Sequence, residues 1–580
     1  MIAALTTTMV PIRVGLGGLL VAAAVLGAVF EQLPTSEMQA RKKPLYHDVN
    51  DQRLRHPEPH NWLMYRRTYD GWGHSPLRQI TSLNVVDLRP AWVFSTGVYG
   101  EHHQSAPIVN EGTMFVTTGA DVIALDAETG DLRWRYRRAL PTEMGRPHPT
   151  NRGVGLYNGN VYVGTLDAYV VALSAVSGQV LWAQAVEDYR LGYYITMAPL
   201  VVNGKVLVGT SGGEHGIRGA IVALDAVTGE VAWRRHTIPA PGESGSASWQ
   251  GDSWRTGGGP VWLTGTYDRD LNVTYWGVGN PGPWMGDTRP GDNLYTNSTI
   301  ALDADTGEMR GYHQYHWNGS WDWDEASAPL LVDIERGGRM LAALVHPGRN
   351  GYLWMLERHA DRLTFVEAAP FVYQNVFTGL DPETGRPSYD PAHVPGTGKR
   401  VQFCPSLRGA RNWTPEAYSP QTGYLYLPAT ENRCSIMEGR PVDYIPGEEF
   451  TGGDYGSFTR EGASHVGELQ AWNLDTGVKV WTREFPSVND GAILTTAGGL
   501  VFQGGPDFRA FNALNGRTLW QMRTNYGRAG VPTSYAVKGV QYIAVQTGAD
   551  RVSGNSQLGT VPRGTLRDGY VWAFALDCQC

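Results

Sequence analysis

Charged residues are scarce in this chain of 580 residues, and basic residues are not in excess. Charged side chains make up 18% of the sequence, and 48 Lys and Arg stand against 56 Asp and Glu, so the formal net charge is −8. Proteins that bind nucleic acids usually present a basic face to the phosphates. The charge balance therefore argues against a nucleic-acid partner.

Cysteine is rarer still, with four residues. None lies in a Cys-x-x-Cys-His motif, so a covalently attached c-type haem is not expected. Cys404 and Cys434 lie within one region of the chain and are expected to form a disulfide if the protein is exported to an oxidising compartment. Cys578 and Cys580 stand at the C-terminal end, where free thiols are as consistent with the sequence as a pairing.

Long hydrophobic runs are lacking too, apart from one uncharged stretch, Val14 to Phe30, that follows Arg13. This stretch is long for the core of a signal peptide and slightly short for a membrane-spanning helix. The polar stretch Glu31 to Lys43 follows it, which disfavours a buried core helix. We expect residues 1–43 to be an export signal plus linker, with an uncleaved inner-membrane anchor as the alternative, and residues 44–580 to be a single periplasmic domain.

Glycine and tryptophan, by contrast, are abundant, with 72 and 20 residues, and they recur in a repeated unit. Ala124 to Gly130 reads Ala-Leu-Asp-Ala-Glu-Thr-Gly, and Trp134 follows shortly after the glycine. A sixth copy, Ala301 to Gly307, has Gly311 where the tryptophan is expected. The other copies, which keep the same interval from Ala to Trp, are Ala172–Trp182, Ala223–Trp233, Ala471–Trp481 and Ala510–Trp520.

This unit predicts two strands joined by a tight turn. Its polar residues and closing glycine suit a turn, because glycine takes a positive φ without strain. The flanking residues, such as Val122-Ile123 and Leu132 to Trp134, are apolar or alternate as strands do. The first copies start roughly 50 residues apart, about the length of a four-stranded propeller blade. The pattern therefore favours an all-β propeller over a solenoid or a sandwich.

The unit resembles the tryptophan docking motif, Ala-x-Asp-x-x-Thr-Gly-x-x-x-Trp, of the alcohol dehydrogenases that depend on pyrroloquinoline quinone (PQQ). Asn61 to Tyr65, Tyr69-Asp70 and Ser75 to Leu77 also look like the first strand of that family. The resemblance covers roughly residues 60–576. It implies an eight-bladed β-propeller with tryptophan docking motifs that oxidises a small alcohol to an aldehyde with PQQ.

Three segments outside the repeats resemble the metal site of the family. Gly279 to Trp284 reads Gly-Asn-Pro-Gly-Pro-Trp and matches the string whose Asn, here Asn280, binds the metal through its side-chain oxygen. Glu214 in Gly-Gly-Glu-His-Gly matches the metal-binding Glu. Asp322 in Trp-Asp-Trp-Asp matches the general base, next to the metal. Such oxygen ligands suit calcium and do not suit zinc, which prefers His or Cys.

Asp324 resembles the extra aspartate of the lanthanide-using branch of the family. With Glu214 and Asp322 it supplies three negative charges, which would balance a trivalent ion. The same Asp-x-Asp spacing could occur in a calcium-type relative. The implied metal is therefore a lanthanide(III) ion, with Ca²⁺ as the alternative.

PQQ is planar and carries three carboxylates, so its site needs cations, amide donors and a flat apolar face. Trp262 matches the tryptophan that forms the floor under the ring. Arg152 in Asn-Arg-Gly and Arg349 in Arg-Asn-Gly match two arginines of the family, and guanidinium groups suit carboxylates and a quinone oxygen. The other positions that match cofactor contacts are Gln104, Thr196, Asn412 and Trp413.

Two positions depart from the family pattern. Many relatives have adjacent cysteines before Asn-Arg-Gly, which form a ring over the quinone, whereas this chain has Arg146 to Thr150 there. A proline or arginine lid would have to replace that disulfide. Gln104 stands where many relatives have Glu, and Gln can bond a carboxylate without adding repulsion.

The resemblance implies that the metal polarises the quinone C5 carbonyl and that Arg349 stabilises its oxygen, while Asp322 takes the alcohol proton as hydride passes to C5. Electrons would then pass to a separate cytochrome c-type acceptor. Two other interpretations stay open: a PQQ dehydrogenase for sugars or polyols, and a non-catalytic propeller that binds partner proteins outside the cytoplasm. A homodimer is compatible with the sequence, and the identity of the alcohol is left open.

Overall fold

The computed structural model describes residues 46–99, 101–145, 147–489, 491–505, 507–524, 528–548 and 568–577, which belong to one compact unit. The expected export signal or anchor, Arg146, and the pair Cys578 and Cys580 lie outside the described residues. Across these described ranges, no helix is both long and apolar enough to cross a membrane.

Strands dominate the described residues, beside one short α-helix, α1 (Asp51–Arg55). In the larger sheets, the inner strands are buried and the outermost strand is partly exposed, because the sheets pack face to face. The turns of 3-10 helix are η1 (Val85–Asp87), η2 (Tyr189–Leu191), η3 (Gly213–His215), η4 (Ser246–Ser248), η5 (Ser253–Thr256), η6 (Gly286–Thr288) and η7 (Pro391–His393).

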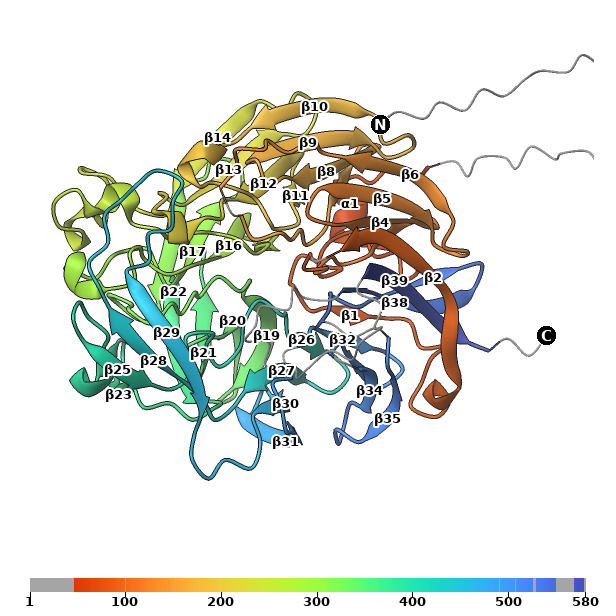
Figure 1. Ribbon diagram of the computed structural model, residues 1–580. Coiled ribbons are helices and arrows are strands. Elements are labelled where there is room, and N and C mark those ends of the chain that lie inside the picture. Colours follow the sequence, from red (N-terminus) through yellow and green to blue (C-terminus); the bar gives the residue numbers. More distant parts are fainter. Residues whose placement is uncertain are drawn as a thin grey trace, which may run out of the picture. The chain divides into compact units, whose positions relative to one another are not determined.

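The first sheets are antiparallel meanders of four strands that follow one another around Figure 1 in chain order, from orange to green. Their strands are β3–β6 (Ile108–Asn110, Thr113–Thr117, Asp121–Asp126, Leu132–Arg137), β7–β10 (Gly155–Tyr157, Asn160–Gly164, Tyr169–Ser174, Val180–Ala185), β11–β14 (Leu200–Val202, Lys205–Gly209, Ala220–Asp225, Val231–His236), β15–β18 (Thr266–Asp268, Val273–Val278, Ser298–Asp303, Met309–Gln314) and β19–β22 (Leu330–Arg336, Arg339–Pro347, Tyr352–Arg358, Leu363–Pro370).

Two small sheets interrupt the later part of the chain. They are β23–β24 (Phe377–Leu380, Pro387–Tyr389) and β25-β28-β29 (Arg400–Phe403, Arg433–Gly439, Gly453–Thr459). The meander then resumes with β26-β27-β30-β31 (Ala417–Ser419, Tyr424–Thr430, Gly467–Asn473, Val478–Phe485) and β1-β32-β33-β34-β35 (His74–Ser75, Ile493–Thr496, Leu500–Gln503, Phe508–Asn512, Thr518–Met522).

The last sheet joins the two ends of the described unit. Its order is β2-β39-β38-β36 (Leu88–Tyr99, Asp568–Leu576, Val540–Gly548, Arg528–Ala529), with β37 (Thr533–Val537) also paired to β38. β2 runs antiparallel to β39, with Val93 opposite Trp572. This pairing covers strand edges that would otherwise be open. Together with the successive meanders, it makes the fold a β-propeller, as the repeats predict.

The repeated unit folds as a cross-strand pair of alanine and tryptophan. Ala124 in β5 lies opposite Trp134 in β6, and the other tryptophan-bearing copies show the same pairing, which accounts for their constant spacing. The indole Nε1 of Trp134 then donates a hydrogen bond of 3.0 Å to the carbonyl oxygen of Ala175 in the next sheet. The same indole lies against Gly178, where a Cβ atom would lie 2.6 Å from the ring. Trp182, Trp233 and Trp481 lie against the glycine of the next turn in the same way, whereas the indole of Trp520 donates to the carbonyl oxygen of Leu88.

The copy without tryptophan, Ala301 to Gly311, packs against the next sheet, β19–β22, in a different way. Gly311 in β18 lies opposite Ala301, at the position that the other copies give to tryptophan. A Cβ atom on Gly311 would lie only 2.8 Å from the Cα of Arg362. The backbone before β22 thus occupies the space that an indole would need.

Replacing Gly178 by Ala is expected to lower the free energy of unfolding by about 1–3 kcal/mol, because the new methyl group would press on the Trp134 ring. The measurement is urea-induced unfolding. Gly462→Ala is the matched control, since Gly462 also has a positive φ, of 76°, but nothing within 4 Å of its Cβ position. Equal losses in the two variants would mean that backbone strain alone, and not the indole contact, decides the cost.

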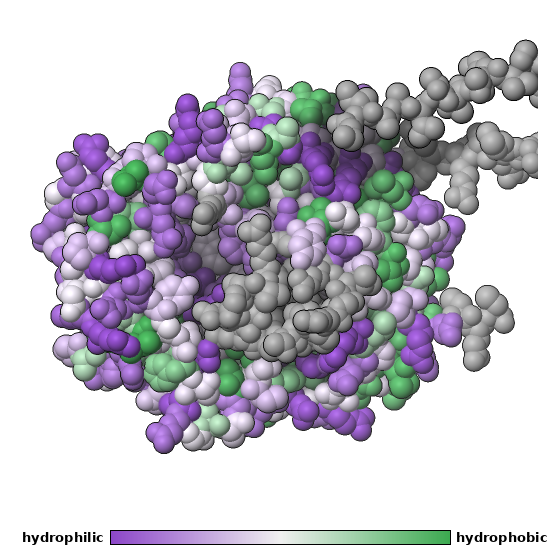
Figure 2. Space-filling view, in the orientation of Figure 1, coloured by the Kyte–Doolittle hydropathy of each residue, from purple (hydrophilic) through white to green (hydrophobic). Residues whose placement is uncertain are grey.

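Hydrophilic residues cover most of the face in Figure 2, and hydrophobic residues are scattered among them. Exposed apolar side chains such as Leu132 and Val180 lie on the outermost strands β6 and β10. Scattered exposure of this kind is usual in globular proteins.

Candidate active site

A pocket of about 290 Å³ gathers the predicted site residues. This volume is close to the lower end of the range of about 300–1,000 Å³ that pockets for small molecules and cofactors have. Of the predicted residues, only Asn280 is not part of the wall. The predicted residues that line the pocket are Gln104, Arg152, Thr196, Glu214, Trp262, Asp322, Asp324, Arg349, Asn412 and Trp413.

Asp324 connects three of the predicted residues. Its Oδ1 accepts a hydrogen bond of 2.8 Å from the backbone N–H of Asn280, which places Asn280 next to the wall. Its Oδ2 accepts one of 3.1 Å from the indole Nε1 of Trp262 and lies 3.3 Å from Nη2 of Arg349. A Cβ atom on Gly279 would collide with Asp324 Oδ1. The glycine of the Gly-Asn-Pro string therefore makes room for this carboxylate.

Asp322 has an uncommon backbone conformation. Its φ is 60°, in the left-handed region, and non-glycine residues with such angles cluster at functional sites. Its backbone oxygen accepts a hydrogen bond of 2.9 Å from Nη1 of Arg349. Its side-chain Oδ1 is buried and has no hydrogen-bond partner among the described residues. This oxygen is therefore available to accept a proton or to bind a cation.

The carboxyl groups of the pocket influence one another. Burial raises the pKa of Asp322 well above its usual value, and the charges of Asp324 and Glu214 raise it further. Burial and the charge of Asp324 likewise raise the pKa of Glu214. Burial also raises the pKa of Asp324, although Arg349 opposes this effect. A cation among these groups would favour their charged forms.

The donor atoms fit a hard cation. Asn280 Oδ1, like Asp322 Oδ1, is buried without a hydrogen-bond partner in the described part of the chain. Carboxylate and amide oxygens are the ligands that calcium-like ions prefer. Where the structure describes the chain, no three His, Cys, Asp or Glu side chains stand close enough together to hold a metal ion. The metal-binding roles of Glu214, Asn280, Asp322 and Asp324 therefore stay predictions.

The metal-free protein is expected to lose stability as the pH rises. The pKa values of Glu214, Asp322 and Asp324 are raised in the folded protein, so folding favours their protonated forms. This contribution is complete below the ordinary carboxyl pKa of about 4 and is lost as the pH rises through the raised values. As the pH is raised from about 5 to about 8, the midpoint temperature of thermal unfolding should therefore decrease. La³⁺ or Ca²⁺ should restore it at the higher pH, and a midpoint that neither ion changes would contradict a cation site here.

Trp262 presents its ring next to two arginines. The Cζ atom of Arg152 lies 4.9 Å from a Trp262 ring centroid, and that of Arg349 lies 5.6 Å away. Arg152 is held by hydrogen bonds from Nη1 to Thr196 Oγ1 (2.7 Å) and to the Trp262 carbonyl oxygen (3.2 Å). Its Nε, like the indole Nε1 of Trp413, is buried without a partner among the described residues. This wall thus offers a flat indole ring and two N–H groups without hydrogen-bond partners among the described residues, which suit a planar anion.

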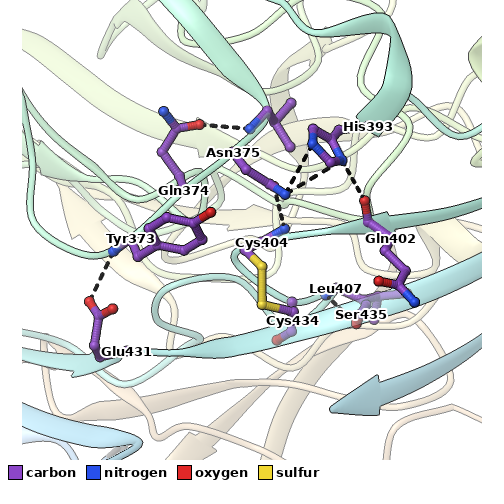
Figure 3. Close-up of a disulfide and its surroundings, with 12 residues drawn as sticks. Tyr373, Gln374, Asn375, His393, Gln402, Cys404, Leu407, Glu431, Cys434 and Ser435 are labelled. Atoms are coloured by element: carbon purple, nitrogen blue, oxygen red, sulfur yellow. Dashed lines mark hydrogen bonds between the residues drawn. A yellow bond between two sulfur atoms is a disulfide. The ribbon is translucent and has the colours of Figure 1, made fainter. Parts of the chain in front are cut away.

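The disulfide predicted between Cys404 and Cys434 is confirmed (Figure 3). It ties β28 to the segment that follows β25. In the same segment, the N–H of Leu407 donates a hydrogen bond of 2.9 Å to Ser435 Oγ on β28. Leu407 lines the pocket, and the loop continues to Asn412 and Trp413. The disulfide therefore anchors the start of a loop that supplies part of the pocket wall.

The segment before Arg152 brings a histidine, and not paired cysteines, to the pocket. The rings of His148 and His102 stack with centroids 4.5 Å apart, and both residues line the pocket. Thr150 Oγ1 donates a hydrogen bond of 2.7 Å to the His102 carbonyl oxygen, which joins the two segments. Gln104 Oε1 is a buried acceptor without a partner among the described residues.

Several lining residues were not anticipated from the sequence. Arg408 adds a third arginine to Arg152 and Arg349, so arginines and carboxylates are equal in number on the wall. Arg408 lies in no recognisable motif, and Tyr455 comes from β29 in an inserted sheet, so the sequence held no signal for either. The lining residues that were not among the predicted site residues are His102, His148, Tyr194, Ser211, Gly212, Pro260, Leu407, Arg408 and Tyr455.

Comparisons with known proteins agree with this architecture. The family model described as "PQQ: Glucose/ethanol/alcohol dehydrogenase, beta-propeller domain" matches residues 62–365 and 463–543. The chain is 37% identical to quinoprotein alcohol dehydrogenase PedH of Pseudomonas putida, over 82% of this chain and 84% of that protein. It is 33% identical to a lanthanide-dependent methanol dehydrogenase of Methylacidiphilum fumariolicum, over 91% and 95% of the two chains. A europium-containing methanol dehydrogenase structure superposes with a TM-score of 0.84 at 31% identity and covers 91% of this chain and 100% of the other.

The β-propeller and the family match place the chain in a class of oxidoreductases that depend on a quinone cofactor. The chain belongs to the family of PQQ-dependent alcohol dehydrogenases within that class. It is therefore an enzyme that oxidises alcohols with PQQ, and the interpretation as a non-catalytic scaffold is not supported.

Proposed function

We propose that the protein oxidises a small alcohol to an aldehyde in this pocket, with PQQ against Trp262 and a metal ion beside Asp322. The observation that supports this most directly is the composition of the wall, where an indole face, three arginines and three carboxylates meet. A planar tricarboxylate and a cation need these groups together. The other residues proposed to bind PQQ are Gln104, Arg152, Thr196, Arg349, Asn412 and Trp413.

Bound PQQ supplies the hydride acceptor, and the metal ion acts as a Lewis acid. Asp322 accepts the alcohol proton through its unpartnered Oδ1. With PQQ bound against Trp262, Arg349 would offer a guanidinium N–H to the quinone oxygen. Its guanidinium is already oriented by the Asp322 carbonyl oxygen and by Asp324 Oδ2.

We infer that the metal is a lanthanide(III) ion, with Ca²⁺ as the alternative. Asp324 and Glu214 add two carboxylates to that of Asp322, which together balance a charge of three. Two of the similar proteins named above are lanthanide-dependent or europium-containing, which supports this choice.

We also propose that the eight sheets with four or five strands, counted over the described residues, are the eight blades of the propeller. The tryptophan contacts between successive sheets would then be docking contacts between blades. The electron acceptor is proposed to be a cytochrome c-type protein. Export to the periplasm, membrane attachment through residues 14–30 and a homodimer are proposals from the sequence.

Dye-linked alcohol oxidation by the purified apoprotein tests the proposal. PQQ is added with La³⁺ or Ca²⁺, and methanol, ethanol, longer alcohols and glucose are compared. Activity that needs La³⁺ supports both the site and the metal, whereas activity with Ca²⁺ alone contradicts the lanthanide assignment. Faster oxidation of glucose than of any alcohol would favour the sugar dehydrogenase, and no PQQ binding with either ion would refute the site.

A further inference from the structure

A buried carboxylate with no part in the proposed chemistry lies directly behind the pocket. Glu325 follows Asp324 in the chain, and its side chain is only 1% exposed. Burying a carboxylate is unfavourable unless hydrogen bonds compensate for the lost water. The hydrogen bonds of Glu325 therefore indicate which groups it holds in place.

Both oxygens of Glu325 bind the loop that carries Arg349. Oε2 accepts a hydrogen bond of 3.0 Å from the backbone N–H of Arg349 and one of 2.7 Å from Nε2 of His346. Oε1 accepts one of 3.3 Å from the backbone N–H of Asn350. Hydrogen bonds to an ionised acceptor are stronger than those between neutral groups. One carboxylate thus fixes the β20–β21 loop relative to the segment Asp322 to Asp324.

The surroundings leave room for this contact and support it. A Cβ atom on Gly348 would lie 3.0 Å from Glu325 Oε2 and 2.7 Å from Asn350 Oδ1, so a larger residue at 348 would crowd the carboxylate. The Tyr315 ring stacks on the imidazole of His346, with centroids 4.3 Å apart. This stacking keeps His346 oriented towards Glu325.

We propose that Glu325 is a positioning residue that sets Arg349 relative to the Asp322 carboxylate; this inference rests on the proposed function. Arg349 is held at both ends, by Glu325 at its backbone and by Asp322 and Asp324 at its guanidinium. Loss of the Glu325 contacts leaves the composition of the wall unchanged but frees the backbone of residues 348–350. A shift of about 1 Å between reacting groups lowers a rate by about 100-fold.

Glu325→Gln tests the proposal because it keeps the shape of the side chain but removes one of its two acceptor oxygens. We expect kcat for alcohol oxidation to fall by about 10- to 100-fold. The Kd of PQQ, measured by quenching of tryptophan fluorescence, should rise by far less than kcat falls, because the other residues proposed to bind PQQ keep their places. The kinetic isotope effect with alcohol deuterated at the carbinol carbon should rise, because hydride transfer becomes more rate-limiting.

Gly348→Ala tests the same contact without changing any group of the pocket. It should reproduce the fall in kcat and the rise in the isotope effect. The double variant should lose little beyond either single variant, because both changes act through one contact. Should Glu325→Gln fail to fold, Gly348→Ala carries the test alone, and an unchanged kcat in it would overturn the proposal.

Glu468→Gln is the matched control. Glu468 is also a buried glutamate paired with a histidine, at 2.7 Å from Nε2 of His465, but it does not line the pocket. Its replacement should lower the unfolding midpoint and leave kcat and the isotope effect unchanged. If Glu325→Gln shows only that pattern, Glu325 has a structural role and the inference is wrong. If the wild-type protein itself oxidises no alcohol with PQQ and either metal, the proposed function is wrong instead.

Discussion

Replacing Asp322 by Asn is expected to lower kcat for alcohol oxidation by about 100- to 10,000-fold, the range that general acid–base catalysis contributes. Asn has nearly the same shape, but its amide cannot take the alcohol proton. Asp322 Oδ1 is the buried carboxylate oxygen without a partner among the described residues of the pocket wall. The measurement is steady-state oxidation at saturating PQQ and metal, together with the Kd of PQQ. That Kd should change little.

Asp270→Asn is the control for this experiment, because the side chain of Asp270 is 88% exposed and lies outside the pocket. It should leave both kcat and the Kd of PQQ unchanged. A kcat for Asp322→Asn within a few-fold of the wild type, at full metal occupancy, would show that another group accepts the proton.

Replacing Asp324 by Asn is expected to weaken La³⁺ binding by about 100-fold or more, beyond the loss typical of residues that only orient metal ligands. The Coulomb attraction of one carboxylate is larger for a trivalent ion than for a divalent one. The loss of affinity should therefore be larger for La³⁺ than for Ca²⁺. Competition with a chromophoric chelator measures both affinities in the apoprotein.

The Ca²⁺ titration is the internal control for the Asp324 experiment. Asp324 also accepts hydrogen bonds from Asn280 and Trp262, so a general disturbance of the site would weaken both ions alike. Equal losses for the two ions would refute the special role of Asp324 with lanthanides. A larger loss for Ca²⁺ would reverse the assignment.

The repeats made most of the fold predictable. The constant interval from alanine to tryptophan, as from Ala124 to Trp134, reflects direct cross-strand pairing, which is a local property of two strands and a turn. Gly311 shows the limit of this reasoning. Its missing indole is explained by the backbone at Arg362, which lies on another strand pair and is brought near only when the sheets pack.

The candidate site was predictable where its residues lie in distinctive strings. Asn280, Asp322 and Arg349 each stand in such a string, and the structure brings them to one place. Arg408, Tyr455 and His102 stand in none, and His148 lies in the segment Arg146 to Thr150, where the sequence led us to expect a proline or arginine lid. They reach the pocket because loops from different sheets converge there.

The sequence by itself determined the repeating strand pairs, the cysteines able to form a disulfide and the family to which the chain belongs, because these depend on local spacing and on contiguous motifs. Only the tertiary structure decided how Asp324 meets Trp262 and Arg349, and that the Glu325 carboxylate holds the Arg349 loop from behind. Those contacts join side chains on separate loops. Their geometry is set by the packing of successive sheets, and a buried carboxylate finds its partners only when water is excluded around it.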